Sequence, residues 1–309
     1  MTFIMLFAGL ALLLFGGEFL VRGGVSLAGH LRLSPVVVGL TIVSMCTSSP
    51  ELVVSLDAAI EGYPDISLGN VVGSNISNLG LVLALTIIIS PFFVNRRSII
   101  EDMIIMAGAS LVLLIMLIDF RFSRIEGLML VAMLVVYIYR SIRNDKKQYR
   151  GIPPLIKYSL LLSLVIVIIS SLFLVAGANM LVKSASTVAS MMGVSDRIIS
   201  VSIVALGTSL PEMATSIIAA FRKQNDISIG NIVGSNIFNI LAILGITISV
   251  QPYGLSDPNF SSDMYWMIGI AVLLIVMVLP SRNPKLSRWK GIFLALVYLS
   301  YIYFVFFMR

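Results

Sequence analysis

The sequence predicts an all-α polytopic membrane protein in which ten transmembrane helices form two inverted five-helix repeats. The chain is 58% hydrophobic and only 12% charged, whereas about a quarter of the residues of a soluble domain are charged. Apolar runs of about 18 residues or more, long enough to cross a bilayer, recur along its whole length. Leu33–Pro91 and Val194–Pro252 align at a constant offset of 161 residues without a gap, and 25 of the 58 positions in Ser34–Pro91 are identical.

The apolar runs predict the spans in order as residues 3–22, 34–60, 66–90, 99–118, 125–142, 155–182, 195–221, 227–250, 264–280 and 289–308. The repeat also includes the first span of each half, because Leu20-Val21-Arg22 matches Leu181-Val182-Lys183 at the same offset. Five spans are an odd number, so the second copy enters the membrane upside down. The predicted organisation is a first half at 1–142, a short cytoplasmic loop at 143–154 and a second half at 155–309.

The basic residues are distributed unequally between the two predicted sides of the membrane. Sixteen of the 21 Lys and Arg residues fall on one side; the five on the other are Arg121, Arg124, Lys183, Arg197 and Arg309. Cytoplasmic loops carry the excess of Lys and Arg. We therefore expect a cell-membrane protein with both termini extracellular. The same excess accounts for the net charge of +6, so we expect no nucleic-acid partner. The single cysteine, Cys46, excludes a disulfide within the chain.

Each repeat copy carries two polar motifs inside apolar sequence. TSSPE at 47–51 precedes GNVVGSNISN at 69–78, and TSLPE at 208–212 precedes GNIVGSNIFN at 230–239. Polar residues are costly within a membrane. Gly/Pro-interrupted apolar segments at corresponding places in two halves are typical of a transporter's binding site.

The proline of the first motif predicts free carbonyl groups halfway through a span. Proline has no N–H and clashes with the carbonyl one turn earlier, which frees backbone oxygens near 46–47 and 207–208. Such oxygens are tolerated at membrane depth only beside polar groups, and hard cations prefer oxygen ligands. The expected ligands are the backbone of Thr47 and Thr208, the hydroxyls of Ser48 and Ser209, and the carboxylates of Glu51 and Glu212.

The second motif supplies further oxygen ligands. Ser74 and Asn78 are spaced i, i+4 and share a helix face, as do Ser235 and Asn239. The glycines at 69, 73, 230 and 234 are expected to allow close helix approach. The asparagines at 70, 75, 231 and 236 are either ligands or hold the broken helices in place. Neither Cys nor His is duplicated, which favours calcium or sodium over zinc or copper; magnesium is disfavoured because it sheds water reluctantly.

The charge of the two glutamates restricts the mechanism. Two carboxylates in a low-dielectric site are very costly unless they are compensated. One Ca²⁺ neutralises them, and so do two or more Na⁺. A site that holds either Ca²⁺ or Na⁺, but not both at once, has the property that an antiporter needs.

At these residues the chain resembles the sodium/calcium exchanger branch of the cation/calcium antiporter (CaCA) superfamily, prokaryotic type. The blocks are similar to its alpha repeats, Gly-Thr-Ser-x-Pro-Glu followed by Gly-Asn-x-x-Gly-Ser-Asn-x-x-Asn. The resemblance covers essentially the whole chain. It implies a Na⁺/Ca²⁺ antiporter, not an enzyme, with no cofactor and no obligatory protein partner. It also implies that spans two, three, seven and eight form a core with mid-membrane ion sites, against which spans one and six slide to alternate access.

The resemblance also implies individual roles. Glu51 and Glu212 would be central ligands shared by calcium and sodium, and Thr47 and Thr208 would contribute backbone carbonyls to calcium. The remaining implied ligands are Ser48, Ser74, Ser209, Ser235 and the backbone at Ser44 and Ala205 for outlying sodium sites, with Asn78 and Asn239 in the middle of the cage.

Three departures from the family pattern bear on function. Cys46 replaces the glycine of the first motif, which Gly207 keeps in the second. Position 239 is Asn, where potassium-dependent relatives carry Asp, and this weakens a case for potassium transport. The predicted cytoplasmic loop of about a dozen residues leaves no room for the calcium-sensing domains of animal exchangers.

Several alternatives stay open on sequence alone. A proton/calcium exchanger shares the fold, a channel has a similar cage, and small polar residues in membrane helices often serve only in packing. An intramembrane enzyme is disfavoured, because His30 is the single histidine and Ser48 and Ser209 lack a nearby base. Glu18, which aligns with Asn179, is expected to make an internal hydrogen bond. Asp57 aligns with Ile218, so it lacks the symmetry of the paired motifs, and it is expected to lie in the interface instead of in an outer vestibule.

Overall fold

The structure is a computed structural model that describes residues 2–148, 156–192, 205–255, 257, 260–279 and 284–307. Part of the predicted 143–154 loop and the beginning of the seventh predicted span lie outside these residues. The described part is predominantly helical, as the apolar composition predicts.

The first half begins with one long helix, continues with two spans that contain breaks or π-helical turns, and ends with two regular helices. Its helices are α1 (Thr2–Leu31), α2 (Pro35–Val38), η1 (Gly39–Val43), α3 (Ser44–Thr47), α4 (Ser49–Ile60), α5 (Pro64–Ser77), η2 (Asn78–Val82), α6 (Leu83–Ile89), α7 (Arg96–Met116), η3 (Leu117–Asp119) and α8 (Arg124–Gln148). Of these, η1 and η2 are π-helical and η3 is a 3₁₀ turn.

The second half follows the same plan where it is described. Its helices are α9 (Leu160–Met191), α11 (Ala205–Gly207), α12 (Leu210–Phe221), α13 (Asn225–Phe238), the π-helical η5 (Asn239–Leu244), α14 (Gly245–Val250), α15 (Phe260–Val278) and α16 (Arg288–Phe307). The π-helices η2 and η5 begin at equivalent asparagines, Asn78 and Asn239.

Eight helices in the described residues are long and apolar enough to cross a membrane, by length and composition. A ninth is the broken span Pro35–Thr47 plus Ser49–Ile60, whose two parts are bent by 47°. The apolar helix Leu210–Phe221 is shorter, and the residues before Ala205 that the sequence assigns to its span are not described. A multi-pass fold is therefore clear, while the ten-span count stays a prediction.

Two helices extend beyond their predicted spans. α1 ends at Leu31 instead of residue 22, and α9 runs from Leu160 to Met191 instead of over 155–182. A charged residue does not end a helix when its charge is compensated or reaches solvent. Arg22 is paired with Glu18 one turn earlier, and Lys183 is exposed.

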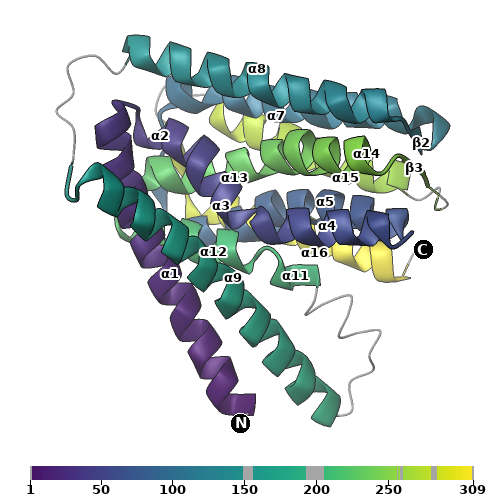
Figure 1. Cartoon of the computed structure of the whole chain (residues 1–309), viewed down its shortest axis with the longest axis horizontal. Coiled ribbons are helices and arrows are strands. Elements are labelled where there is room, and N and C mark those ends of the chain that lie inside the picture. Colours follow the sequence, from purple (N-terminus) through teal and green to yellow (C-terminus); the bar gives the residue numbers. More distant parts are fainter. Residues whose placement is uncertain are drawn as a thin grey trace.

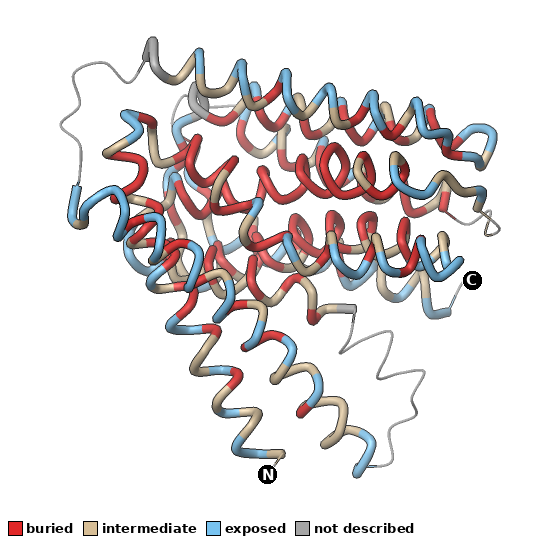
Figure 2. Tube along the Cα trace, viewed as in Figure 1, coloured by how far each residue is buried: buried red, intermediate tan, exposed pale blue. Residues whose placement is uncertain are grey.

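The helices form a main bundle from which α1 and α9 project together (Figure 1). These two helices pack closely at paired glycines, where a Cβ on Gly9 would lie 2.8 Å from the carbonyl oxygen of Gly177 and the reverse contact has the same length. The most buried segments are α5 and α13 with the helices that continue them, at the centre of the bundle (Figure 2). In contrast, α8 and α16 are mostly not buried and expose large apolar side chains.

Two short antiparallel ribbons join the halves reciprocally. β1 (Phe92–Phe93) pairs with β4 (Lys285–Leu286), and β2 (Arg121–Phe122) pairs with β3 (Tyr253–Gly254). β1 and β3 are equivalent at the offset of 161, and each pairs with the loop that precedes the last helix of the opposite half. This exchange of partners is typical of two repeats related by a pseudo-twofold axis.

Candidate cation site between the two repeats

Each Pro–Glu pair begins a new helix after a break in its span. α3 ends at Thr47 and α4 starts at Ser49, while α11 ends at Gly207 and α12 starts at Leu210. The residues at the breaks, Ser48 and Ser209, have nearly identical backbone angles (φ −87°, ψ 9° and φ −82°, ψ 1°). Proline suits the first turn of a helix because its missing N–H would be unpaired there. Glu51 and Glu212 therefore lie in a first turn, where the helix dipole favours negative charge.

The two carboxylates are buried and largely without partners. Glu51 and Glu212 are both 0% exposed. Ser48 donates a hydrogen bond of 2.8 Å to Oε1 of Glu212, and the hydroxyl of Ser235 lies 3.5 Å from the same oxygen. Oε2 of Glu212 and both carboxylate oxygens of Glu51 have no hydrogen-bond partner among the described residues. Because buried carboxylates are costly unless they are compensated, these oxygens are suited to a bound cation.

Asn78 and Asn239 offer further unpaired oxygens. Asn78 is fully buried, and neither atom of its amide has a partner in the described structure. Asn239 donates from Nδ2 to Oδ1 of Asn75 at 3.0 Å, and its own Oδ1 is unpartnered. Both residues begin π-helical turns, which occur frequently at functional sites.

Asn70 and Asn231 hold the glutamate-bearing helices against the next helix. Asn70 donates to the carbonyl of Glu51 at 3.2 Å and to the hydroxyl of Ser55 at 2.8 Å. Asn231 donates equivalently to the carbonyl of Glu212 at 3.5 Å and to the hydroxyl of Ser216 at 3.0 Å. In the structure, Asn70 and Asn231 therefore hold the broken helices in place. The two serines were missed from sequence, although they lie four residues after each glutamate at the same offset of 161.

Asn75 and Asn236 differ from each other in their contacts. The Nδ2 group of Asn75 lies 3.4 Å from the carbonyl oxygen of Asn236, so Asn75 joins α5 to α13. Asn236 instead donates within its own helix, to the carbonyl of Ile232 at 2.7 Å. Asn75 therefore holds the two repeats together at the site.

The remaining candidate ligands are engaged unequally in the two repeats. Thr47 donates from its hydroxyl to Oδ1 of Asn231 at 3.0 Å, whereas the buried hydroxyl of Thr208 has no partner among the described residues. Ser209 lies 3.4 Å from the hydroxyl of Ser77, in contrast to the contact of Ser48 with a glutamate. The hydroxyl of Ser74 is buried and unpartnered.

Ser44 and Ala205 are the two positions expected to supply backbone oxygens to outlying sodium sites. The hydroxyl of Ser44 donates to the carbonyl of Gly39 at 2.5 Å and lies 3.4 Å from the carbonyl oxygen of Asn231 in the other repeat, so it is already engaged. Ala205 begins α11, and its side chain lies outside the described part. A backbone role for either residue stays a prediction.

A cavity of about 420 Å³ reaches the site from one side. Its lining includes Gly69, Asn70, Gly73, Ser74, Ser77, Leu206 and Thr208, together with residues of α16. A Cβ at Gly73 would have no neighbour within 4 Å, whereas one at Gly234 would lie 2.6 Å from the carbonyl oxygen of Leu40. The expected close approach at the glycines therefore holds for Gly230 and Gly234, but not for Gly69 and Gly73, which border the cavity.

The family model for the sodium/calcium exchanger protein matches residues 1–143 and 162–307. The chain belongs to the sodium/calcium exchanger family. It is 33% identical to a putative antiporter, CaxA, of Alkalimonas amylolytica over 98% of both chains. It is 26% identical to the sodium/calcium exchanger MaX1 of Methanosarcina acetivorans over 99% of both chains. The structure of the sodium-calcium exchanger NCX_Mj without Na⁺ and Ca²⁺ superposes with a TM-score of 0.86 at 30% identity, covering 97% of each chain.

Family membership confirms the resemblance seen in the motifs. The chain is a prokaryotic-type member of the CaCA superfamily and a transmembrane cation/calcium antiporter. The family is one of transporters and not of enzymes.

Proposed function

We propose that the protein exchanges Na⁺ for Ca²⁺ across the cell membrane by alternating access, and that both ions compete for one site centred on Glu51 and Glu212. The observation that carries this proposal is a fully buried carboxylate from each repeat, with three of the four oxygens unpartnered in the described structure. A folded protein tolerates such a pair only if a cation or a proton compensates it.

The neighbouring groups favour a hard cation. Buried side-chain oxygens that have no partner in the described structure include those of the candidate ligands Asn78, Asn239, Ser74 and Thr208. Carboxylate, amide and hydroxyl oxygens suit Ca²⁺ and Na⁺. The backbone of Thr47 and Thr208 would complete the calcium site. Sodium would additionally use Ser48, Ser74, Ser209, Ser235 and the backbone at Ser44 and Ala205.

Charge balance accounts for exchange in place of co-transport. Two carboxylates are compensated by one Ca²⁺ or by two or more Na⁺. Ca²⁺ and Na⁺ bound together would leave excess positive charge in a low-dielectric site. The free-energy cost of that charge is about as large as the cost of leaving the carboxylates uncompensated. The site therefore holds calcium or sodium, and each ion displaces the other.

The one-sided cavity supports alternating access. It is bordered by Ile66 near the start of α5 and by Phe306 near the end of α16, both near the side that the basic residues assign to the cell exterior. The equivalent face of the other repeat is closed where α13 packs on η1. A site open on one side and closed on the other is the arrangement that alternating access requires.

Calcium flux in proteoliposomes tests the coupling ion. We expect calcium uptake driven by an opposed sodium gradient and little response to an imposed pH gradient. A response to the pH gradient alone would instead establish a proton/calcium antiporter of the same fold. Calcium flux without any counter-ion would indicate a channel.

Substitution of the two glutamates tests the site. Glu51→Gln and Glu212→Gln each remove one negative charge with little change in shape, so we expect calcium exchange to fall at least tenfold while the protein stays folded. Asp57→Asn is the matched control, because Asp57 is an exposed carboxylate on the same helix as Glu51. Exchange at the wild-type rate in either glutamine variant would contradict the proposed site.

A further inference from the structure

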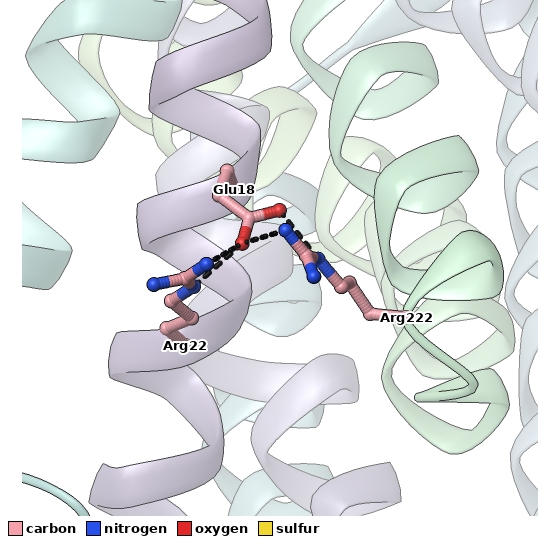
Figure 3. A network of polar contacts seen from close by, with 3 residues as sticks. All are labelled: Glu18, Arg22 and Arg222. Carbon is pink, nitrogen blue, oxygen red and sulfur yellow. Dashed lines mark hydrogen bonds and ion pairs between the residues drawn. The ribbon is translucent and has the colours of Figure 1, made fainter.

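One charged network outside the cation site connects the projecting helix pair to the main bundle. Glu18 of α1 is paired with Arg22 one turn later at 2.5 Å (Figure 3). The same carboxylate receives two contacts from Arg222, which follows the last residue of α12: Nη2 lies 2.7 Å from Oε1, and Nε donates to Oε2 at 2.9 Å. α12 is the helix that carries Glu212. The network therefore links α1 directly to an element of the cation site.

The offset of 161 residues places a second charged set at the equivalent positions. Arg22 corresponds to Lys183 on α9, and Arg222 corresponds to Glu61, directly after α4, while Glu18 corresponds to Asn179. In the first set both arginines converge on the carboxylate of Glu18. The same arrangement in the second set would bring Lys183 and Glu61 together, with the negative charge on the residue that follows α4 and the positive charge on α9.

The second set is separated in this structure. Lys183 and Glu61 are both exposed, and neither has an ion-pair partner among the described residues. The packing of the helices shows the same asymmetry. α1 packs along α12, whereas α9, the counterpart of α1, makes no comparable contact with α4 in the described structure. The cavity that reaches the cation site is lined in part by Val54 of α4.

We propose that these two charged sets are alternating latches of the transport cycle. The Glu18–Arg222 pair stabilises the state seen here, with the site open to the predicted outside. A Lys183–Glu61 pair forms in the opposite state, in which α9 packs on α4 and the cavity closes. The proposal rests on alternating access as proposed above. It follows from the requirement that each end state have contacts that the other lacks.

The strength of the pairs suits a reversible device. Arg222 and Arg22 have side chains that are 54% and 37% exposed, and Lys183 and Glu61 are exposed as well. Solvent screens ion pairs of this kind, so each biases the equilibrium modestly. A modest bias in both directions leaves the two states close in free energy, as repeated cycling needs.

Disulfide cross-linking tests the predicted contact. In a Cys46→Ala background, Glu61→Cys and Lys183→Cys are combined and oxidised with copper phenanthroline in proteoliposomes. We expect a disulfide within the chain, although the two positions are unpaired here. The control combines Glu61→Cys with Leu172→Cys, an exposed position on α9 about 16 Å farther along the helix, and should not cross-link.

The outcome separates the latch from the antiport proposal. Calcium and sodium flux is measured on the same reduced samples. Exchange without a disulfide between positions 61 and 183 would overturn the latch and leave the antiporter intact. A disulfide in protein that shows no sodium-driven calcium flux would support the closing movement but contradict the proposed function.

Distances between spin labels test the energetic roles of the charges. Labels at Tyr63→Cys and Met191→Cys, both exposed, measure the opening between α4 and α9. We expect Glu18→Gln to shift the population about two- to fivefold toward the short distance, and Glu61→Gln to shift it similarly toward the long one. The double reversal Glu61→Lys with Lys183→Glu should restore the distribution that Glu61→Lys alone disturbs. Distributions unchanged by both glutamine variants would overturn the proposal.

Discussion

Asn231 joins three segments of the candidate site through a single amide. Its Nδ2 group donates to the backbone carbonyl of Glu212 and to the hydroxyl of Ser216, both on α12. Its Oδ1 accepts from the hydroxyl of Thr47 on α3. Asn70, at the equivalent position, makes the first two kinds of contact, and the hydroxyl of Thr208 is left without a partner in the described structure. At the scale of single residues, identical side chains at equivalent positions of the two repeats therefore make different numbers of hydrogen bonds.

The stability of two alanine variants should reveal this difference. Asn231→Ala leaves buried groups on both neighbouring segments without a partner, at a cost of about 1–3 kcal/mol for each stranded group. Asn70→Ala leaves fewer such groups, because Asn70 borders the cavity and water can replace its contacts. We expect a clearly lower Tm in detergent for Asn231→Ala than for Asn70→Ala. Equal losses would contradict the asymmetry.

At the scale of elements, glycines set the distance at which the central helices cross. A Cβ on Gly230 would lie 2.6 Å from the carbonyl oxygen of Val36, and one on Gly234 would lie equally close to that of Leu40. The equivalent Gly69 and Gly73 face open space or distant side chains. Small residues allow this close crossing in membrane bundles, and here only one of the two equivalent crossings is closed.

Alanine at the two equivalent glycines should have different effects. Gly234→Ala overpacks a closed crossing and should destabilise the protein by about 1–3 kcal/mol, measured as a lower Tm. Gly73→Ala meets open space, so we expect an unchanged Tm but slower calcium exchange, because the methyl group obstructs closure of the cavity. A Gly73→Ala protein that exchanges calcium at the wild-type rate would show that this crossing does not close during transport.

At the scale of the whole molecule, the distribution of basic residues predicts how the protein lies in the membrane. Sixteen Lys and Arg residues on one predicted side against five on the other predict that both termini lie outside the cell. The cavity that reaches the site lies toward the same predicted exterior. Orientation and access together predict that this state receives ions from outside the cell.

Labelling of intact cells tests the orientation. In a Cys46→Ala background, a membrane-impermeant maleimide should react with Tyr63→Cys, on the predicted exterior, and fail to react with Lys285→Cys, on the predicted cytoplasmic side. Both positions are exposed, so each should react once the membrane is made permeable. The reverse pattern in intact cells would invert the predicted topology.

The positions of the breaks and of the polar groups could be predicted because they depend on local sequence. Pro50 and Pro211 mark the beginning of new helices within their spans, as expected for a residue without an N–H. Glu18 makes internal contacts, as expected, but its partner Arg222 lies 204 residues away. The ends of α1 and α9 were predicted too early because charged residues there are paired or exposed instead of ending the helix.

The sequence by itself determined the membrane class, the sequence repeat, the family and the oxygen-rich character of the candidate site, because each of these depends on residue types and on their spacing. The tertiary structure decided which copy of each polar group is engaged, which glycine crossing is closed, and which ion pair is formed. The physical reason is that the candidate site is open on one side only. The helix crossing is therefore open in one repeat and closed in the other, although the two sequences are nearly equivalent. Long-range packing therefore selects between states that local sequence leaves equivalent.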